Sequence, residues 1–416
     1  MQNRDPAIRR LMLFFAIVFM AEGIDQGRVG VVLQPLTNFL KTQGWSPLEV
    51  TAYFGALNFP WVIKPVYGLI SDFVPLFGYR RTTYLMLASA GALLAYGAIA
   101  WLGEPAAIAP FLVVTAYCMA TVSTLCGALL AENGRTYRQS SLFVGQQWLW
   151  FNVAIMASTL VGGELVEHLS ATSALKAGAV IAALAPIAVL VATPLLLRET
   201  RSTGERQAFR QALRGLSTAL RSRSLYLVAA FLFLYSFSPG FGTPLYYHMT
   251  DQLHFSQSYI GLLGSITAAG WIAGALLHRL ALRRLAPKSL LYLSVLLGTA
   301  STASFLLLSD EVSAALVNFG FGVSSMIATI ATLTLAARHC PLGAEGFAFA
   351  GLMSVSNLAE IFSINSGAWL YEHVFDSRMA PLIVVSAAAT AAIAVLIPLL
   401  RLNGQSDDDS GNAAMP

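Results

Sequence analysis

Long apolar runs alternate with short polar segments along almost the whole chain. Each run has about 20 residues, the length that an α-helix needs to cross the hydrocarbon core of a bilayer. The pattern therefore predicts twelve membrane-spanning helices, over residues 11–36, 48–73, 82–102, 108–131, 141–166, 174–197, 224–249, 257–280, 288–308, 312–337, 346–371 and 380–401.

Composition agrees with this pattern. Hydrophobic residues make up 56% of the chain, charged residues 11%, and the mean hydropathy is +0.66. An ordinary soluble domain has about a quarter of its residues charged, so that class is excluded. The first apolar run is too long for a signal peptide and lacks a small-residue cleavage site, which makes it a permanent helix. Cys118 and Cys126 share one predicted helix and cannot bond, so we expect no disulfide framework.

The distribution of Lys and Arg orients the chain. If the N-terminus is cytoplasmic, almost all loop cations are cytoplasmic, and Lys41, Lys176 and Arg378 lie on the other side. This bias predicts a multi-pass protein of the cell (inner) membrane with both termini in the cytoplasm. It also accounts for the net charge of +4, which is then no sign of nucleic-acid binding.

The predicted helices fall into two groups. Residues 198–223 form the longest and most basic connection, between a six-helix bundle over 1–197 and another over 224–403, and residues 404–416 form a polar tail that we expect to be disordered. Two pseudo-symmetric six-helix bundles are the architecture of major facilitator transporters. The basic connection is either a linker that obeys the positive-inside rule or a segment that binds anionic lipid.

One turn between two apolar runs carries charges at the membrane boundary. Gly68 and Asp72 end the second predicted helix, and Gly78, Arg80 and Arg81 lead into the third. Such charges pair with one another or with helix ends, and a conformational change can switch the pairing. We therefore predict a cytoplasmic gate here, in which the carboxylate of Asp72 binds Arg81 or the N-terminus of a facing helix.

Several segments carry a family resemblance. The turn over 68–81 resembles the signature of the major facilitator superfamily, and residues 61–68, 239–261, 335–346 and 352–358 resemble the folate-biopterin transporter family more specifically. The matches are collinear and touch both halves. They imply a secondary transporter of a pterin, a folate or another small polar organic molecule.

The fourth predicted helix departs from that family. Acidic residues are expected one turn apart in it, but Ser123 and Gly127 stand there, while Glu132 and Arg135 are retained and become gating candidates. Recognition of a pterin therefore cannot simply be inherited through this helix. Either the acidic groups have moved to other helices or the solute has changed.

The first predicted helix carries its own charges. Glu22, Asp25 and Arg28 are spaced by three, so that each neighbours the next on one face, and Gln26 lies beside them. A charge at mid-membrane costs about 3 kcal/mol, which favours a protein-lined or wet environment. Either Asp25 and Arg28 form a packing ion pair, or the group binds solute and its spare carboxylate exchanges protons.

Two further helices add candidates. Lys64 precedes Pro65, which breaks the backbone hydrogen bonding of its helix, so Lys64 either extends to the cytoplasmic face or binds Glu360 or an anionic solute. Asn357 and Glu360 are one turn apart in the eleventh predicted helix. A lone carboxylate there is expensive, which makes Glu360 a further proton carrier and, with Asn357, a binding candidate.

Aromatic and amide side chains complete the candidate binding site. Gln147 and Trp148 could supply an in-plane partner and a stacking face for a planar heteroaromatic solute. The segment over 238–244 interrupts the seventh predicted helix, and Tyr246 follows it as either a gate or part of an interfacial aromatic belt.

Enzymatic chemistry has little support. The sequence contains no P-loop, no His/Cys set with metal-ligand spacing and no nucleophile elbow. We therefore expect neither metal nor cofactor. The sequence favours a monomeric, proton-coupled secondary transporter whose partners are a small-molecule substrate, protons and the lipid bilayer. The alternatives are a major facilitator transporter of an unrelated small organic solute, and a receptor or scramblase without solute transport.

Overall fold

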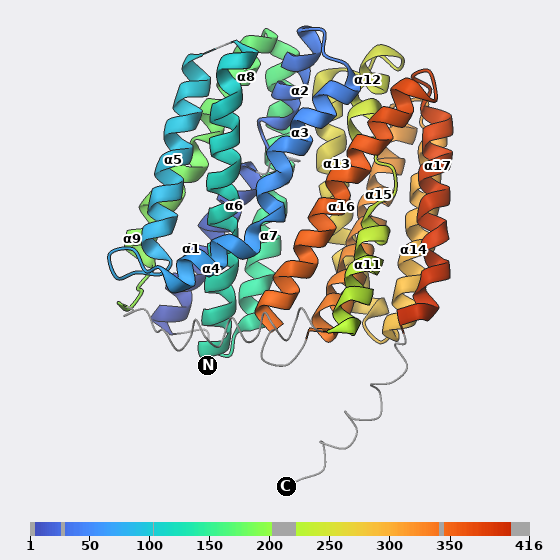
Figure 1. The fold of residues 1–416 in the computed structure, drawn as a ribbon. Helices are drawn as coiled ribbons and strands as arrows, with labels where there is room; N and C mark the ends of the chain where they lie inside the picture. Colours follow the sequence, from blue (N-terminus) through green and yellow to red (C-terminus); the bar gives the residue numbers. More distant parts are fainter. Residues whose placement is uncertain (1–4, 26–29, 103, 202–221, 341–344, 401–416) are drawn as a thin grey trace.

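The computed structural model describes residues 5–25, 30–102, 104–201, 222–340 and 345–400, and these are almost entirely helical. Figure 1 shows the helices running between two ends of one bundle, with the two halves of the chain side by side. In chain order, the first half contains α1 (Pro6–Ile24), α2 (Leu33–Thr42), α3 (Pro47–Val62), α4 (Lys64–Phe73), α5 (Thr82–Trp101), α6 (Pro105–Thr136), α7 (Ser140–His168), α8 (Ala171–Ala182) and α9 (Leu184–Leu196).

The helices of the second half also follow one another in chain order. It contains α11 (Arg223–Ser236), α12 (Gly242–Asp251), α13 (Gln257–Leu277), η2 (His278–Leu282), α14 (Pro287–Ser304), η3 (Phe305–Leu307), α15 (Glu311–Arg338), α16 (Glu345–His373), α17 (Met379–Ala392) and η4 (Ile393–Leu400). Most of the predicted connection over 198–223 and all of the predicted tail over 404–416 lie outside the described residues.

Several predicted spans are two helices rather than one. The span over 11–36 is divided into α1 and α2, and the span over 48–73 is divided at Ile63. Pro65 explains the second division, because it has no N–H to donate to the preceding turn. Among the described residues, eight helical ranges are long and apolar enough to cross a membrane, so the number twelve stays a prediction.

The predicted interruption of the seventh span is confirmed. The helix α11 ends at Ser236 and α12 begins at Gly242. The intervening backbone is hydrogen-bonded by its neighbours: Ser386 Oγ donates to the Pro239 carbonyl at 2.6 Å, and Gly240 N–H donates to the Ser363 carbonyl at 2.9 Å. A break in a membrane helix is tolerated where such partners replace the lost helical bonds.

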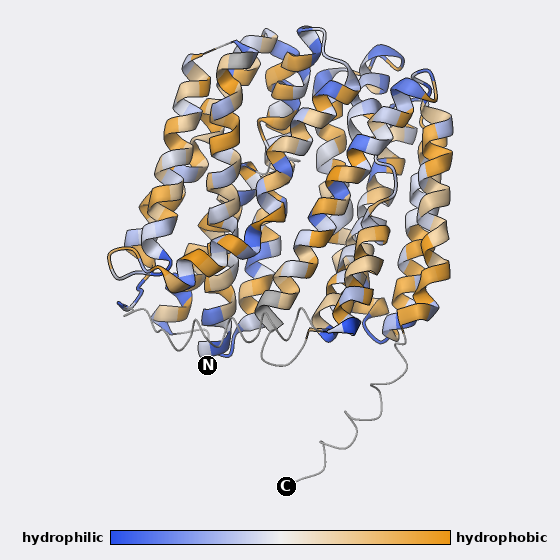
Figure 2. Ribbon diagram, in the orientation of Figure 1, coloured by the Kyte–Doolittle hydropathy of each residue, from blue (hydrophilic) through white to orange (hydrophobic). Residues whose placement is uncertain are grey.

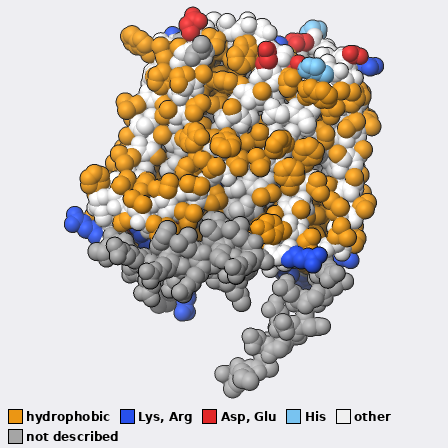
Figure 3. All heavy atoms as spheres, in the orientation of Figure 1, with side chains coloured by type: hydrophobic (Ala, Val, Ile, Leu, Met, Phe, Trp, Pro, Cys, Tyr) orange, Lys and Arg blue, Asp and Glu red, His pale blue; other side chains and the backbone are white. Residues whose placement is uncertain are grey.

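The surface has a broad apolar belt between two polar ends. Figure 2 shows hydrophobic residues over the sides of the bundle. In Figure 3, one end carries Lys and Arg, and the other end carries acidic and His side chains together with a few Lys and Arg. Large side chains such as Leu94, Trp101 and Leu316 are at least 70% exposed on these helices, as expected for contact with lipid. We call the end that carries Arg80, Arg81, Arg135, Arg279 and Arg338 the arginine-rich end.

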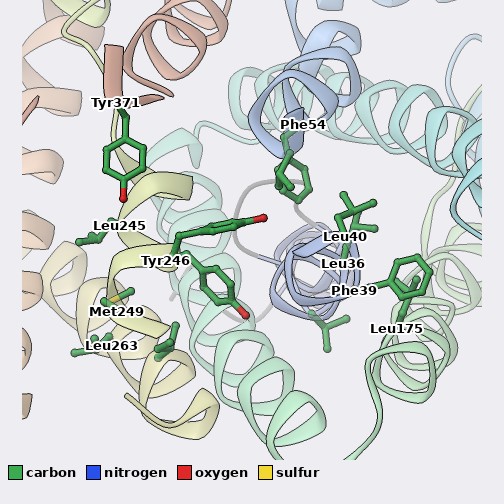
Figure 4. Close-up of a cluster of buried hydrophobic side chains, with 14 of the residues drawn as sticks. Leu36, Phe39, Leu40, Phe54, Leu175, Leu245, Tyr246, Met249, Leu263 and Tyr371 are labelled. Carbon is green, nitrogen blue, oxygen red and sulfur yellow. The ribbon is translucent and has the colours of Figure 1, made fainter. Parts of the chain in front are cut away.

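The two halves are joined most tightly between α7 and α13. A Cβ atom on Gly261 would lie 2.5 Å from the Thr159 carbonyl oxygen, and one on Gly163 would lie 2.9 Å from Gly261 Cα. The backbones therefore touch, which only glycine allows at this distance. Nearer the opposite end, a shared apolar cluster contains Phe39 and Phe54 of one half and Leu245, Met249 and Tyr371 of the other, as Figure 4 shows.

Candidate substrate cavity and gates

The end opposite the arginine-rich end is closed by polar contacts between the halves. Lys41 on α2 pairs with Asp251 and Thr250 at the end of α12. The ammonium also lies 4.8 Å from the ring centre of Tyr247, whose hydroxyl donates to the Trp45 carbonyl at 2.6 Å. Cation–π and hydrogen-bond contacts of this kind hold α2, α12 and the start of α3 together.

Two carboxylates reinforce this seal by binding the first N–H groups of helices in the other half. Glu372, near the end of α16, accepts a 2.6 Å hydrogen bond from Leu48 N–H at the start of α3. Glu167, near the end of α7, accepts 2.6 Å and 3.4 Å bonds from Gln257 and Ser258 N–H at the start of α13. Helix N-termini favour negative charge, so both contacts stabilise the closed arrangement.

A cavity of about 410 Å³ lies beneath the seal, between the halves. The first half contributes α2, α3 and α7, and the second contributes α12, α13, α15 and α16. Apolar walls such as Phe54 and Ile361 alternate with polar side chains, the usual construction of a small-molecule site. The polar side chains are those of Gln34, Thr37, Asn58, Ser158, Thr159, Thr243, Tyr246, Asn318 and Glu360.

The cavity contains two of the predicted binding residues, and a third lies next to it. Tyr246 and Glu360 line this cavity, and the Tyr246 hydroxyl donates a hydrogen bond to Gln257 Oε1 at 2.9 Å. The Tyr246 ring therefore forms part of the cavity wall next to the closed end and does not belong to an aromatic belt at the lipid interface. Asn357, one turn before Glu360, donates to the Trp61 carbonyl of α3 at 2.9 Å. The α16 face that bears Asn357 and Glu360 therefore meets the other half directly.

The predicted charges of the first half form a hydrogen-bonded line across three helices. Lys64 Nζ on α4 donates to Ser123 Oγ on α6 at 2.9 Å, and Ser123 Oγ donates to Glu22 Oε1 on α1 at 2.5 Å. The serine that stands where an acid was expected thus connects a cation to a carboxylate from another helix. Lys64 lies within the protein rather than extending freely to the membrane surface.

Asp25 has a different environment from Glu22. It ends α1 as its C-cap, is 8% exposed, and borders a small cavity of about 50 Å³ with Trp61 and Thr115. Its Oδ2 has no hydrogen-bond partner among the residues that the structure describes. Gln26 and Arg28, the other candidates here, lie outside the described residues.

Asp72 and Glu132, two of the predicted gating residues, bind the guanidinium of a third, Arg81. Arg81 is 4% exposed in its side chain and binds Asp72 Oδ1 at 2.6 Å and Glu132 Oε1 at 2.8 Å. Gly78 takes a φ of +84°, which a residue with a side chain adopts only with strain, and so turns the chain toward Arg80 and Arg81. Arg81 joins α4, α5 and α6, all of one half, so this cluster braces that half and does not bridge the two.

Other predicted residues are not in either site. Gln147 is half-buried and Trp148 is 36% exposed, and neither lines the 410 Å³ cavity. Arg135 is exposed at the arginine-rich end, and Gly68 has only the Thr124 methyl 4.0 Å from where its Cβ would lie. These residues lie on the elements predicted for them, and their roles in binding or gating stay predictions.

The sequence reasoning missed three carboxylates. Glu199 accepts hydrogen bonds of 2.8–3.1 Å from the backbone N–H groups of Arg80, Arg81 and Thr82, and so caps the start of α5. Glu167 and Glu372 were missed as well, although a signal exists. Each is followed by His at the end of a long helix, and each binds a helix that begins after a serine N-cap, which is an internal repeat.

The arrangement of the helices defines the class: a polytopic helical membrane protein with the major facilitator fold. A mutant of the nucleoside transporter NupG superposes with a TM-score of 0.74 at 14% identity, over 94% of this chain and all of that one. A D-xylose–proton symporter superposes with a TM-score of 0.70 at 15% identity, over 94% of this chain and 97% of that one. At this identity the likeness concerns the fold alone.

The chain belongs to the BT1 family, whose profile matches residues 29–412. A folate-biopterin transporter of Synechocystis sp. is 30% identical over 401 residues, 90% of this chain and 78% of the relative. The probable folate-biopterin transporter 6 of Arabidopsis thaliana is 27% identical over 405 residues, 88% of this chain and 77% of the relative. The predicted family and the prediction of a transporter rather than an enzyme are confirmed.

Proposed function

We propose that this chain is a secondary active transporter that moves a folate- or pterin-like solute across the membrane by alternating access, coupled to protons. The observation that carries the proposal is the 410 Å³ cavity, which takes its polar lining from both halves of the chain. A solute held there contacts 1–197 and 224–403 together, so its binding affects how the halves sit against each other. The proposal takes the protein as a monomer, because one chain supplies the whole cavity.

The chemistry of the lining suits a planar heterocycle. A pterin ring carries adjacent N–H donors that a carboxylate can accept side by side, and Glu360 is the carboxylate of this cavity. The amides of Asn58, Asn318 and Gln34 can pair with the remaining ring edges, and Phe54 and Tyr246 supply aromatic faces. The names of the two relatives described above point to the same class of solute.

Alternating access is supported by the unequal closure of the two ends. Hydrogen bonds between described residues of different halves run from the Lys41–Asp251 pair at one end to Asn357–Trp61 and Ser265–Met156 near the middle. Between described residues, no such bond is found nearer the arginine-rich end than these. The arrangement is that of a transporter closed on one side, and we assign the arginine-rich end to the cytoplasm because of the positive-inside rule.

Uptake into proteoliposomes tests the proposal. Purified protein would be reconstituted and given labelled biopterin or folate, with an acidic exterior and then with no pH gradient. We expect accumulation above the external concentration only with the gradient, abolished by a protonophore, and strongly reduced in Glu360→Gln. Glu311→Gln, an exposed carboxylate at the start of α15, is the matched control and should behave as wild type.

The possible results separate the alternatives. Uptake that equilibrates but never accumulates contradicts proton coupling while leaving the transporter in place. If folded protein moves neither probe in either gradient direction, folate and pterin are not its solutes. Transport of another organic solute would then indicate an unrelated cargo, and lipid exchange between leaflets without any solute movement would indicate a scramblase.

A further inference from the structure

A second cavity, an apolar groove of about 460 Å³, lies between α1 and α9 on the outside of the first half. Every residue that lines it is Ala, Val, Ile, Leu or Met, and α1 and α9 supply all of them. Its rims are open to the surroundings, because the side chains of Leu13, Val191 and Leu195 are more than half exposed. The groove is therefore a feature of the membrane-facing surface and is separate from the candidate substrate cavity.

Small residues make this surface concave. Ala21 on α1 and Ala185 and Ala192 on α9 are buried along the floor of the groove. Larger side chains, Leu13 on α1 and Leu195 on α9, stand at its edges with 52% and 69% of their surface exposed. A channel with an alanine floor and leucine rims accommodates a flexible apolar chain along the two helices.

The length of the groove matches one leaflet of a bilayer. It follows α1 from Leu13 to Ile24, which is about 16 Å at 1.5 Å per residue. The hydrocarbon core of a bilayer is about 30 Å thick, so one leaflet is about 15 Å deep. Figure 1 shows that α1 begins and α9 ends at the arginine-rich end. The groove therefore lies at the depth of the leaflet next to that end.

Two arginines lie where the groove meets the arginine-rich end. Arg10 is one turn before Leu13 and continues the row of α1 residues that line the groove at helical spacing. Arg198 follows the end of α9. The next residue, Glu199, accepts a hydrogen bond from the Arg80 N–H, which places this segment at the arginine-rich end. The headgroup of a lipid whose chain lies in the groove would be at the level of both guanidinium groups.

These two guanidinium groups are not neutralised by the protein. Among the described residues, neither Arg10 nor Arg198 forms an ion pair, and the buried Nε of Arg10 has no hydrogen-bond partner. The nearby carboxylates bind backbone instead: Asp5 accepts from the Ala7 N–H at the start of α1, and Glu199 caps α5. A cationic donor without an acceptor is costly, so an anion from outside the chain would stabilise this corner.

We propose that the groove and the two arginines form a binding site for an anionic phospholipid. One acyl chain lies along the floor between α1 and α9, and the phosphate accepts hydrogen bonds from Arg10 and Arg198. Guanidinium groups bind phosphate oxygens in pairs, which favours Arg over a simple point charge here. The cytoplasmic leaflet, on the side proposed for the arginine-rich end, is rich in anionic lipid.

The lipid would act on the packing of the first half. By contacting α1 and α9 together, it stabilises the position of α1, the helix that carries Glu22 and Asp25. The site takes no residue from the 410 Å³ cavity, so it does not depend on which solute the protein binds or whether it transports one. Arg198 also begins the basic connection predicted over 198–223, for which lipid binding was one of two alternatives.

Two lipids with identical chains test the site on the purified full-length protein. Dioleoyl phosphatidylglycerol is anionic and dioleoyl phosphatidylcholine is zwitterionic. In an uncharged detergent, the phosphatidylglycerol should raise the thermal unfolding midpoint by several degrees more than the phosphatidylcholine, because a ligand that binds only the folded state stabilises it. Glycerol 3-phosphate, a headgroup without chains, should give no shift at the same concentration. Native mass spectrometry should detect retained phosphatidylglycerol.

Variants assign the effect to the groove and to its two arginines. The Arg10→Gln/Arg198→Gln double variant should bind phosphatidylglycerol about tenfold more weakly and respond equally to both lipids. Ala188→Leu, which fills the groove, should also weaken retention of phosphatidylglycerol without changing any charge. Arg283→Gln/Arg284→Gln removes two exposed charges from the same end of the other half and is the matched control, which should behave as wild type.

Three results would overturn the inference. Equal shifts of the midpoint for both lipids in the wild type, a measurement that needs no variant to fold, would show that the charge of the headgroup is not recognised. A full shift with glycerol 3-phosphate alone would show that the groove is not needed. An equal loss of phosphatidylglycerol binding in Arg283→Gln/Arg284→Gln would show a general attraction of anionic lipid to the arginine-rich end rather than a site between α1 and α9.

Discussion

Glu372 Oε1 accepts a 2.6 Å hydrogen bond from the backbone N–H of Leu48, across the boundary between the two halves. The same relationship recurs between Glu167 and Gln257, also at 2.6 Å. In each case the last turn of a long helix places a carboxylate on the positive end of a helix in the opposite half. Two equivalent contacts on the two sides of one cavity are suited to hold that end closed.

We therefore expect the Glu167→Gln/Glu372→Gln double variant to open the sealed end more often. A neutral amide interacts more weakly with a helix N-terminus than a carboxylate does, and two contacts are affected together. In a background without native cysteines, Thr243→Cys in the cavity should react severalfold faster with an impermeant maleimide added from the sealed side. Glu164→Gln, one turn before Glu167 and exposed, should leave the rate unchanged. An unchanged rate in the double variant would show that the carboxylates do not hold the gate.

The orientation of the chain can be measured by labelling in intact cells. Single cysteines beside Lys41, Lys176 and Arg378 should react with an impermeant reagent added outside, and a cysteine at Ser222 should react only after permeabilisation. The expectation follows from the concentration of Arg and Lys at one end of the bundle. Labelling at Ser222 in sealed cells would reverse the assignment of the arginine-rich end to the cytoplasm.

Some of this structure was readable from the sequence because the signal was local. The turn over 68–81 brings Asp72 within nine residues of Arg81, and the predicted pairing of these two residues is present at 2.6 Å. The helix breaks after Val62 and Ser236 follow from Pro65 and from the segment over 238–244. Glu199 caps α5 from more than 100 residues away, a contact that no local pattern indicates.

The rotation of each membrane helix about its own axis is harder to predict from the sequence. In a membrane both lipid and protein interior are apolar, so hydrophobic periodicity does not tell which face of a helix points to the cavity. This is why Gln147 and Trp148 on α7 were predicted to line the site, whereas Ser158 and Thr159 of the same helix do so. Likewise, the sequence shows only that Ser123 stands where the family resemblance implies an acidic residue. The packing of α1 against α6 brings the Glu22 carboxylate to the Ser123 hydroxyl, and no local pattern indicates that contact.

Asp72→Asn is expected to lower transport by at least about tenfold while the protein still inserts and folds. Arg81 is almost fully buried in its side chain and would lose one of its two carboxylate partners, which weakens the brace between α4, α5 and α6. Uptake per folded molecule is the measurement, with insertion checked by surface labelling. Asp376→Asn, at an exposed surface position, is the control. Normal uptake would leave Asp72 with a role in topology only.

Gly261→Ala should destabilise the protein through the contact between α7 and α13. The added methyl group would lie 2.5 Å from the Thr159 carbonyl oxygen, so one helix must move, at a cost of about 1–3 kcal/mol. The thermal unfolding midpoint in detergent should fall by several degrees. Gly97→Ala, whose Cβ would meet no atom within 4 Å, should leave the midpoint unchanged or raise it. Equal midpoints for both variants would mean that this close contact is not needed for stability.

Proton coupling should reside in Glu22, Asp25 and Glu360 rather than in acids of α6. Glu22 ends a line that begins at a cation, Asp25 is buried with one oxygen that has no partner among the described residues, and Glu360 faces the cavity. A carboxylate in such surroundings can load and release a proton as the cavity changes its exposure. We expect at least one of Glu22→Gln, Asp25→Asn and Glu360→Gln to exchange labelled solute across proteoliposome membranes at a measurable rate yet fail to concentrate it under a pH gradient. If all three variants accumulate solute with the wild-type pH dependence, these carboxylates serve the structure and the coupling group lies elsewhere.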